Sequence, residues 1–208
     1  MSSGAVREDG SAVSRADRAL FRVESALTLA SGLFIMGVML LSVANILGRK
    51  LFNLPVDGYI DWMIQAVPMM AFLGISYVQR LGGHIRMDIV VGALKGRALW
   101  IAEFVGVLVM FLIALALIYG TWNHASRAFR LGDSTTDINL PIWPVKAMVT
   151  LMLILFAVRC ALQLWAYARA IRTGEDEPVA VPLIEDAAAQ ARHEAETVSG
   201  FDEEEGPA

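Results

Sequence analysis

The sequence lacks the clustered residues on which most enzymes and metal proteins depend. It has one cysteine, Cys160, which excludes an intrachain disulfide, a Cys-x-x-Cys pair and a zinc site built from thiolates. No Gly-x-Ser-x-Gly elbow places Ser126 beside His124, and no Gly-rich run ends in Gly-Lys-Ser or Gly-Lys-Thr. The sequence therefore gives no support to a nucleophilic enzyme or to a phosphate-binding loop.

Charged residues are also scarce. They make up 18% of the 208 residues, against about 25% in soluble domains, while 56% are hydrophobic and the mean hydropathy is +0.55. The net charge of −4 is unevenly distributed, because residues 173–208 carry eleven acids against one basic residue, Arg192. The basic residues before this tail flank apolar runs instead of forming one basic face, which argues against nucleic acid as a partner.

Long apolar runs with few or no charges predict an all-α integral membrane protein with four transmembrane helices. Each run is close to the ~20 residues that a helix needs to cross a bilayer. Pro68 predicts a kink in the second span. We expect Lys146 and Arg159, about 20 Å apart along the fourth span, to reach opposite interfaces with their long side chains. The four-helix domain covers residues 25–168, with spans at about 25–48, 62–79, 98–126 and 140–163.

Polar segments flank this domain on both sides. Residues 1–24 have no short apolar core followed by a cleavage site, so we expect the N-terminus to be retained. Apolar residues at helical spacing, opposite Arg15, Arg18 and Arg22, predict a short amphipathic helix on the inner leaflet or a simple extension of the first span. The acidic composition of residues 169–208 predicts a mostly disordered cytoplasmic tail.

The distribution of basic residues near the span ends predicts the orientation. Nine of them fall on the side that holds both termini and four on the other, so the positive-inside rule places both termini in the cytoplasm. The four on the outer side are Arg49, Lys50, Arg127 and Arg130. Trp62, Trp122 and Trp143 at the outer span ends agree with this arrangement, because tryptophan favours the headgroup level.

Glu103 is the one ionisable residue that this reading places inside a span away from its ends. It lies about 8 Å from the start of the third span, where headgroup water is within reach. We expect an interfacial or intersubunit salt bridge rather than proton coupling. No span has an unwound Gly/Pro centre by sequence, which disfavours a self-sufficient carrier. The small pairs Ala26/Ala30 and Ala102/Gly106 permit close packing against helices of this chain or of a partner.

The segment after the second span holds the densest polar cluster of the chain, Gly83, His84, Arg86 and Asp88. His84 and Asp88 are four residues apart, as in a helical metal pair, but no second histidine or carboxylate pair completes a site. We therefore expect no metal and no cofactor, and assign the cluster a structural or docking role.

Several ordered motifs resemble one known family, the DctQ-type small membrane subunit of tripartite ATP-independent periplasmic (TRAP) transporters. The resemblance covers about residues 20–170, and its most specific element is Gly83-His84-Ile85-Arg86-Met87-Asp88. It is supported by residues 45–52 with Pro55, by Asp61-Trp62 leading into 72–74, and by residues 140–144. This chain has Asp61 where the family usually has a glutamate.

The resemblance implies a non-catalytic subunit of the bacterial inner membrane. It implies a large membrane subunit that holds the substrate and sodium sites, a periplasmic solute-binding protein, and uptake of an organic acid. The small subunit is expected to brace the large one and to help dock the binding protein. We expect contacts with partners or interfaces, membrane lipids included, at Arg49, Lys50, Asp61, Trp62, Glu103, Arg127, Arg130 and Lys146.

Two other classes stay open on the sequence alone. A glutathione-using four-helix membrane enzyme needs Arg, Asn, Glu and Tyr clustered at one membrane face, and here they are scattered. A small self-assembling exporter needs a central acid and is usually shorter. Neither class explains the ordered motifs.

Overall fold

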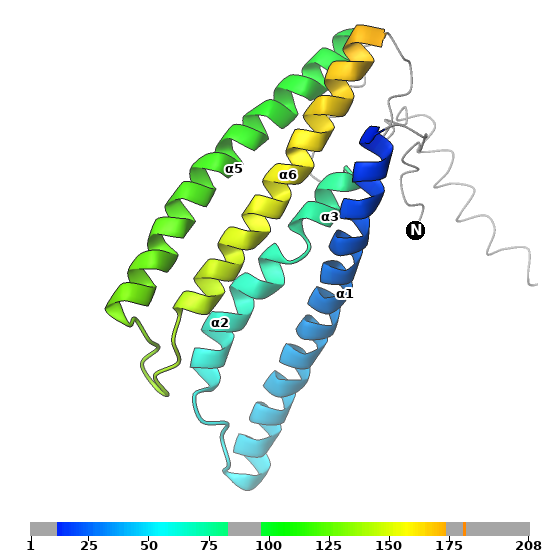
Figure 1. Ribbon diagram of the computed structural model, residues 1–208. Coiled ribbons are helices and arrows are strands. Elements are labelled where there is room, and N and C mark those ends of the chain that lie inside the picture. Colours follow the sequence, from blue (N-terminus) through cyan, green and yellow to red (C-terminus); the bar gives the residue numbers. More distant parts are fainter. Residues whose placement is uncertain (1–11, 83–96, 174–180, 182–208) are drawn as a thin grey trace, which may run out of the picture.

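The computed structural model describes residues 12–82, 97–173 and 181, and within these ranges the chain is a bundle of long helices (Figure 1). The second span consists of two helices. A short π-helix, η1, continues the helix of the first span. The elements are α1 (Ala12–Leu47), η1 (Gly48–Phe52), α2 (Tyr59–Phe72), α3 (Ile75–Arg80), α5 (Arg97–Leu131) and α6 (Trp143–Thr173).

Four helical segments are long and apolar enough to cross a membrane, which confirms the expected number of spans. They are Ala12–Phe52, Tyr59–Arg80, Ala98–Leu131 and Trp143–Thr173. The sequence placed the first span at 25–48, so the helix begins about a dozen residues earlier than expected. The third and fourth helices also run beyond their apolar cores, because charged residues end an uncharged run without ending a helix.

Helix α6 is the centre of the bundle. It shares its largest interface with α5 and also contacts α1, α2 and α3 (Figure 1). Trp100 and Tyr167 stack between α5 and α6 with their ring centroids 6.1 Å apart, and Cys160 and Phe156 are buried beside them in the same apolar cluster. Helix α1 lies at the edge of the bundle, beside α2 and α3, so most of its apolar surface faces away from the chain.

The second span is broken, which the sequence analysis did not expect. Pro68 lies inside α2 without ending it, and the helix stops at Phe72, to resume at Ile75 after Leu73 and Gly74. Glycine is a weak helix former, which explains why the break falls at Gly74. The break lies near the hydroxyl of Ser31 on α1, which donates a hydrogen bond to the carbonyl of Met70 at 3.4 Å.

The segment expected as an amphipathic helix is the first part of α1. No break separates residues 12–24 from the rest of the helix, so of the two alternatives the structure has the extension of the first span. Arg15 and Arg22 are exposed, whereas Asp17 and Glu24 are each only 1% exposed. The acids of this segment therefore face the bundle and the arginines face outward.

Candidate functional site

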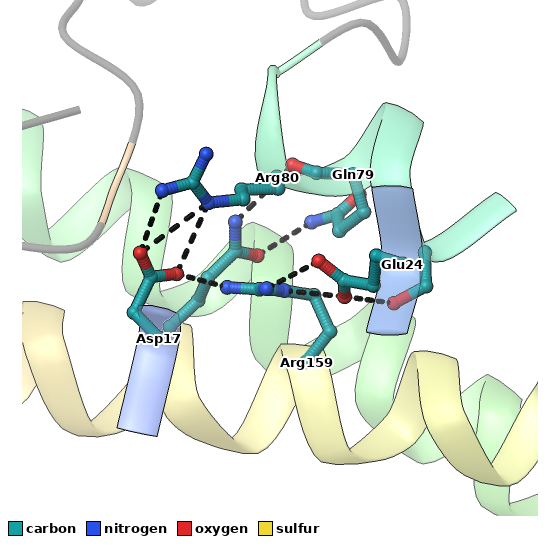
Figure 2. Close-up of polar contacts among 7 residues, drawn as sticks. Asp17, Glu24, Gln79, Arg80 and Arg159 are labelled. Atoms are coloured by element: carbon teal, nitrogen blue, oxygen red, sulfur yellow. Dashed lines mark hydrogen bonds and ion pairs between the residues drawn. The ribbon is translucent and has the colours of Figure 1, made fainter. Parts of the chain in front are cut away.

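The largest fully buried side chain among the described residues is that of Arg159, in the middle of α6. Its guanidinium group is completely buried and forms ion pairs with both acids of α1, through Nη1 to Asp17 and through Nη2 to Glu24 (Figure 2). Its Nε also donates to Oε1 of Glu24 at 2.8 Å. One cation thus joins two carboxylates that are seven residues, or two helical turns, apart on one face of α1.

Arg80, at the end of α3, supplies the second cation. Its Nη2 lies 2.7 Å from Oδ2 of Asp17, and its guanidinium carbon lies 3.8 Å from the centre of the Phe21 ring. The hydroxyl of Ser76 donates to Oε1 of Glu24 from the same short helix. Two acids from α1 and two arginines from α3 and α6 therefore form a buried cluster without net charge.

Two glutamines form a further contact between α3 and α6 beside these ion pairs. The side-chain nitrogen of Gln79 donates to Oε1 of Gln163 at 2.7 Å, and the side-chain nitrogen of Gln163 donates to the backbone carbonyl of Gln79 at 3.2 Å. Both side chains are almost fully buried. We call Asp17, Glu24, Ser76, Gln79, Arg80, Arg159 and Gln163 the inner polar cluster.

The inner polar cluster corrects two expectations. Arg159 does not extend to an interface, because its guanidinium group is bound by Asp17 and Glu24 within the bundle. Glu103 is not the one buried ionisable group, since Asp17, Glu24 and Arg80 are buried as well. A charge buried in the protein costs several kcal/mol unless it is paired, and this pairing supplies the compensation.

The sequence contained a signal for the cluster that counting uncharged runs overlooks. Arg159 and Gln163 are four residues apart on the fourth helix, and Gln79 and Arg80 end the second span. Both helices therefore carry polar residues near the same end of the bundle. The partner acids, however, precede the first uncharged run and were assigned to a surface segment.

Glu103 has a partner within the chain. The hydroxyl of Tyr167 on α6 donates to Oε2 of Glu103 on α5 at 3.2 Å, and Glu103 is 7% exposed. This contact joins the two central helices. A role of Glu103 between subunits stays a prediction.

Asp61, in the first turn of α2, organises the opposite end of the bundle. Its side chain is completely buried, and Oδ2 accepts hydrogen bonds from the Thr135 hydroxyl at 2.6 Å and from the backbone nitrogens of Asp137 and Ile138 at 3.0 and 2.8 Å. Oδ1 is buried and has no hydrogen-bond partner among the described residues. One carboxylate therefore holds the α5–α6 connection against α2.

Glycine at position 58 makes this contact possible. Gly58 precedes α2 with a φ of +65°, and a Cβ added there would come within 2.5 Å of Cδ1 of Ile138. Both the backbone conformation and the close approach of Ile138 thus favour glycine where the loop packs on the start of α2.

Further polar contacts join helix ends at the same end of the bundle as Asp61. Oδ1 of Asn45 on α1 accepts a hydrogen bond from the backbone nitrogen of Val56 at 2.9 Å. The hydroxyl of Tyr59 donates to Oγ of Ser42 at 3.0 Å. Lys146 lies 4.0 Å from Asp133, and both side chains are more than a third exposed, so this ion pair contributes little.

The remaining candidates are dispersed. Arg49 and Lys50 are exposed in η1, whereas Arg127 and Arg130 are exposed at the end of α5, and these helix ends lie at one end of the bundle but on opposite edges (Figure 1). Trp62 is about half exposed on α2. The motif residues expected to form the polar loop, namely Gly83, His84, Arg86 and Asp88, lie outside the described residues.

The geometry as a whole defines a class of protein. Within the described ranges no three His, Cys, Asp or Glu residues are grouped so that they would hold a metal ion. Asp17, Glu24, Arg80 and Arg159 bind one another across helices, and the buried carboxylates of Glu103 and Asp61 accept hydrogen bonds from neighbouring segments. Such an arrangement is that of a multi-span membrane protein whose internal polar residues hold its helices together.

Comparison with known proteins gives the family. Residues 38–170 match the family described as tripartite ATP-independent periplasmic transporters, DctQ component, and the chain belongs to this family. It is also similar to the C4-dicarboxylate TRAP transporter small permease protein DctQ of Vibrio cholerae serotype O1, with 28% identity over 111 residues. That match covers 52% of this chain and 48% of the relative, so it spans about half the length of either protein. No solved structure matches the chain significantly.

Family membership confirms the expectation that the chain is a transporter component and not an enzyme. Together with the four apolar helices, it indicates a multi-pass protein of the inner membrane.

Removing the charge of Arg159 is expected to destabilise the chain strongly. Arg159→Gln leaves Asp17 and Glu24 buried with one fewer cation, which costs about 3 to 5 kcal/mol of the free energy of unfolding. Arg172→Gln, an exposed arginine on the same helix, is the matched control and should change stability by less than about 0.5 kcal/mol. Thermal unfolding of the purified variants in detergent measures both. Equal melting temperatures for the two variants would contradict the role of the cluster.

Replacing Asp61 is expected to loosen the connection between α5 and α6. Asp61→Ala removes the acceptor of three hydrogen bonds, so Thr135 and the backbone nitrogens of Asp137 and Ile138 lose their partner. Limited proteolysis should then cut within residues 132–142 faster than in the unaltered chain. Asp57→Ala, an exposed acid in the neighbouring loop, serves as the control. Unchanged cleavage in Asp61→Ala would show that the carboxylate does not hold this loop.

Proposed function

We propose that this chain is the supporting subunit of a sodium-coupled importer of organic acids. In this proposal a large membrane subunit holds the substrate and sodium sites, and a periplasmic solute-binding protein delivers the solute. The present chain braces the large subunit in the membrane and helps to receive the binding protein. Both termini lie in the cytoplasm, as the excess of basic residues near that side indicates.

The observation that carries the proposal is the neutral inner polar cluster. A transport pathway needs charged or polar groups that are available to the solute or to the coupling ion. In this bundle, Asp17 and Glu24 are bound by Arg80 and Arg159, and Glu103 accepts a hydrogen bond from Tyr167. The broken second span adds Ser76 to this cluster. Buried ionisable residues line the transport pathway in many membrane proteins, whereas in this chain they hold helices together.

A bracing role also fits the distribution of rigidity and apolar surface. The α5–α6 pair has the most extensive internal contact, whereas α1 and the outer faces of α2 and α5 expose large apolar side chains. Membrane subunits that support others need a firm internal packing and an apolar exterior that helices or lipid can cover. The solute class is proposed from the Vibrio cholerae relative, whose name refers to C4-dicarboxylates.

Assembly with a large subunit is the first test. When the tagged chain is co-expressed with the large subunit of the same transporter, we expect both to be recovered together in mild detergent. Cells lacking this chain should lose uptake of labelled C4-dicarboxylate, and the chain supplied in trans should restore it, as should the control variant Arg172→Gln. Full uptake without this chain would refute the proposal.

Docking of the binding protein is the second test. Charge reversal at Arg49, Lys50, Arg127 and Arg130 should slow association of the binding protein with the complex by about tenfold at low salt, because exposed charges act mainly on the association rate. Surface plasmon resonance on nanodisc-embedded complex measures this rate. Arg172→Glu, on the other side of the membrane, should leave it unchanged. Association that is insensitive both to salt and to the fourfold reversal would exclude these residues.

A further inference from the structure

An apolar groove of about 510 Å³ lies between α1, α2 and the beginning of α6. Leu33, Gly37 and Leu41 of α1 form one wall, and Met63 of α2 and Pro144 of α6 belong to the other. The groove is in the half of the bundle opposite the inner polar cluster. Its volume lies in the range of ligand-sized cavities, about 300 to 1,000 Å³, but its lining is nearly all apolar.

The groove exists because α1 is attached mainly by polar contacts. Asp17 and Glu24 bind it at the inner end, Ser31 contacts α2 near the middle, and Asn45 binds it at the outer end. In the most apolar stretch of the first span only 6% of the residues are buried by the rest of the chain, against 39% in the corresponding stretch of α6. Helix α1 is therefore positioned precisely while most of its apolar surface stays uncovered.

The wall of the groove continues as a seam along the whole of α1. We define this seam as the eleven positions from Ala12 to Leu47 that follow one another at alternating steps of four and three residues. Every position is apolar, and ten of the eleven are exposed. One of its two lines consists of Ala16, Val23, Ala30, Gly37 and Ala44.

Small residues distinguish the seam from an ordinary lipid-facing surface. Seven of the eight Ala and Gly residues of α1 fall on it, and only Gly32 lies elsewhere. Acyl chains gain nothing from small side chains, whereas a second helix approaches closely where side chains are small. The alternating spacing is that of left-handed helix packing, in which side chains of one helix fit between those of the other. The seam therefore fits a helix.

The charges beside the seam indicate which kind of helix can pack against it. Arg15 and Arg22 each directly precede a seam residue and are exposed, whereas Asp17 and Glu24 are buried and paired within the chain. A second copy packed in parallel would bring two rows of arginines together, which is unfavourable. A different helix, with acidic residues at its cytoplasmic end, would be complementary.

We propose that a transmembrane helix of the large membrane subunit packs along the seam of α1 and fills the groove beside Gly37. This inference rests on the proposed function, since it assigns the surface through which the supporting role is exerted. The partner helix carries an apolar face in the membrane and acids near its cytoplasmic end.

Gly32 and Gly37 provide a matched pair of variants to test this. Both are exposed in α1, and a Cβ added at either position meets no atom within 4 Å, so a side chain can begin at both sites without a clash in the isolated chain. Gly37→Leu should lower the amount of large subunit recovered with the tagged chain by about tenfold, because close helix approach is lost. Gly32→Leu should leave recovery unchanged. The melting temperature of each purified variant verifies that the chain still folds.

Photo-crosslinking identifies the occupant directly. The photoreactive residue p-benzoylphenylalanine, placed at Ala30 in the co-expressed complex, should form an adduct with the large subunit, whereas the same residue at Gly32 should not. An adduct with a second copy of this chain, or with lipid alone, would overturn the inference. If the unaltered chain recovers the large subunit but Gly37→Leu recovers it equally well, the seam is excluded and the proposed function stands. If the unaltered chain never recovers the large subunit, the proposed function fails as well.

Discussion

The ion pairs of Arg159 with Asp17 and Glu24 determine how the four spans of this chain are joined. Arg159 is completely buried in the central helix, and its two partners lie on the outermost one. Because an unpaired charge is so costly in lipid, α1 has to lie where both carboxylates reach the guanidinium group. The break at Gly74 acts in the same direction, since α3 presents Ser76 and Arg80 to the same two acids.

Polar contacts have this influence because lipid offers helices little hydrophobic reason to associate. Leu and Ile side chains are as well accommodated by acyl chains as by a neighbouring helix, so packing and hydrogen bonds decide the arrangement. In this chain the polar groups form two separate groupings: the inner polar cluster joins α1, α3 and α6, and Asp61 joins the start of α2 to the α5–α6 connection. The apolar middle of α1 is left to be covered by something outside the chain.

The sequence was sufficient for the number of spans, for the central apolar stretches and for the family. These properties follow from local composition and from short ordered motifs. It was not sufficient for the inner polar cluster, because Arg159 and Asp17 are 142 residues apart and their pairing leaves no local pattern. Counting uncharged runs also misled at Glu24, since it treats a charge as the end of a span even when a partner helix neutralises it. Arg159 was placed inside the fourth span, but its side chain was expected to reach the interface instead of the acids of α1. The break at Gly74 was missed because Pro68 carried the stronger local signal and α2 continues through it.

The same pairing that holds α1 also determines what α1 offers to a partner. With Asp17 and Glu24 turned into the bundle, the exposed side of the inner end is left with Arg15 and Arg22, and this side therefore has one sign of charge. The side of α1 that carries the small residues is likewise kept free, because Asn45 and the inner polar cluster fix the rotation of the helix about its own axis. A helix held in this way does not need to reorganise when a partner binds, and less conformational freedom is lost on association. One orientation of α1 thus both buries Asp17 and Glu24 in their ion pairs and leaves the small residues of the helix exposed to a partner.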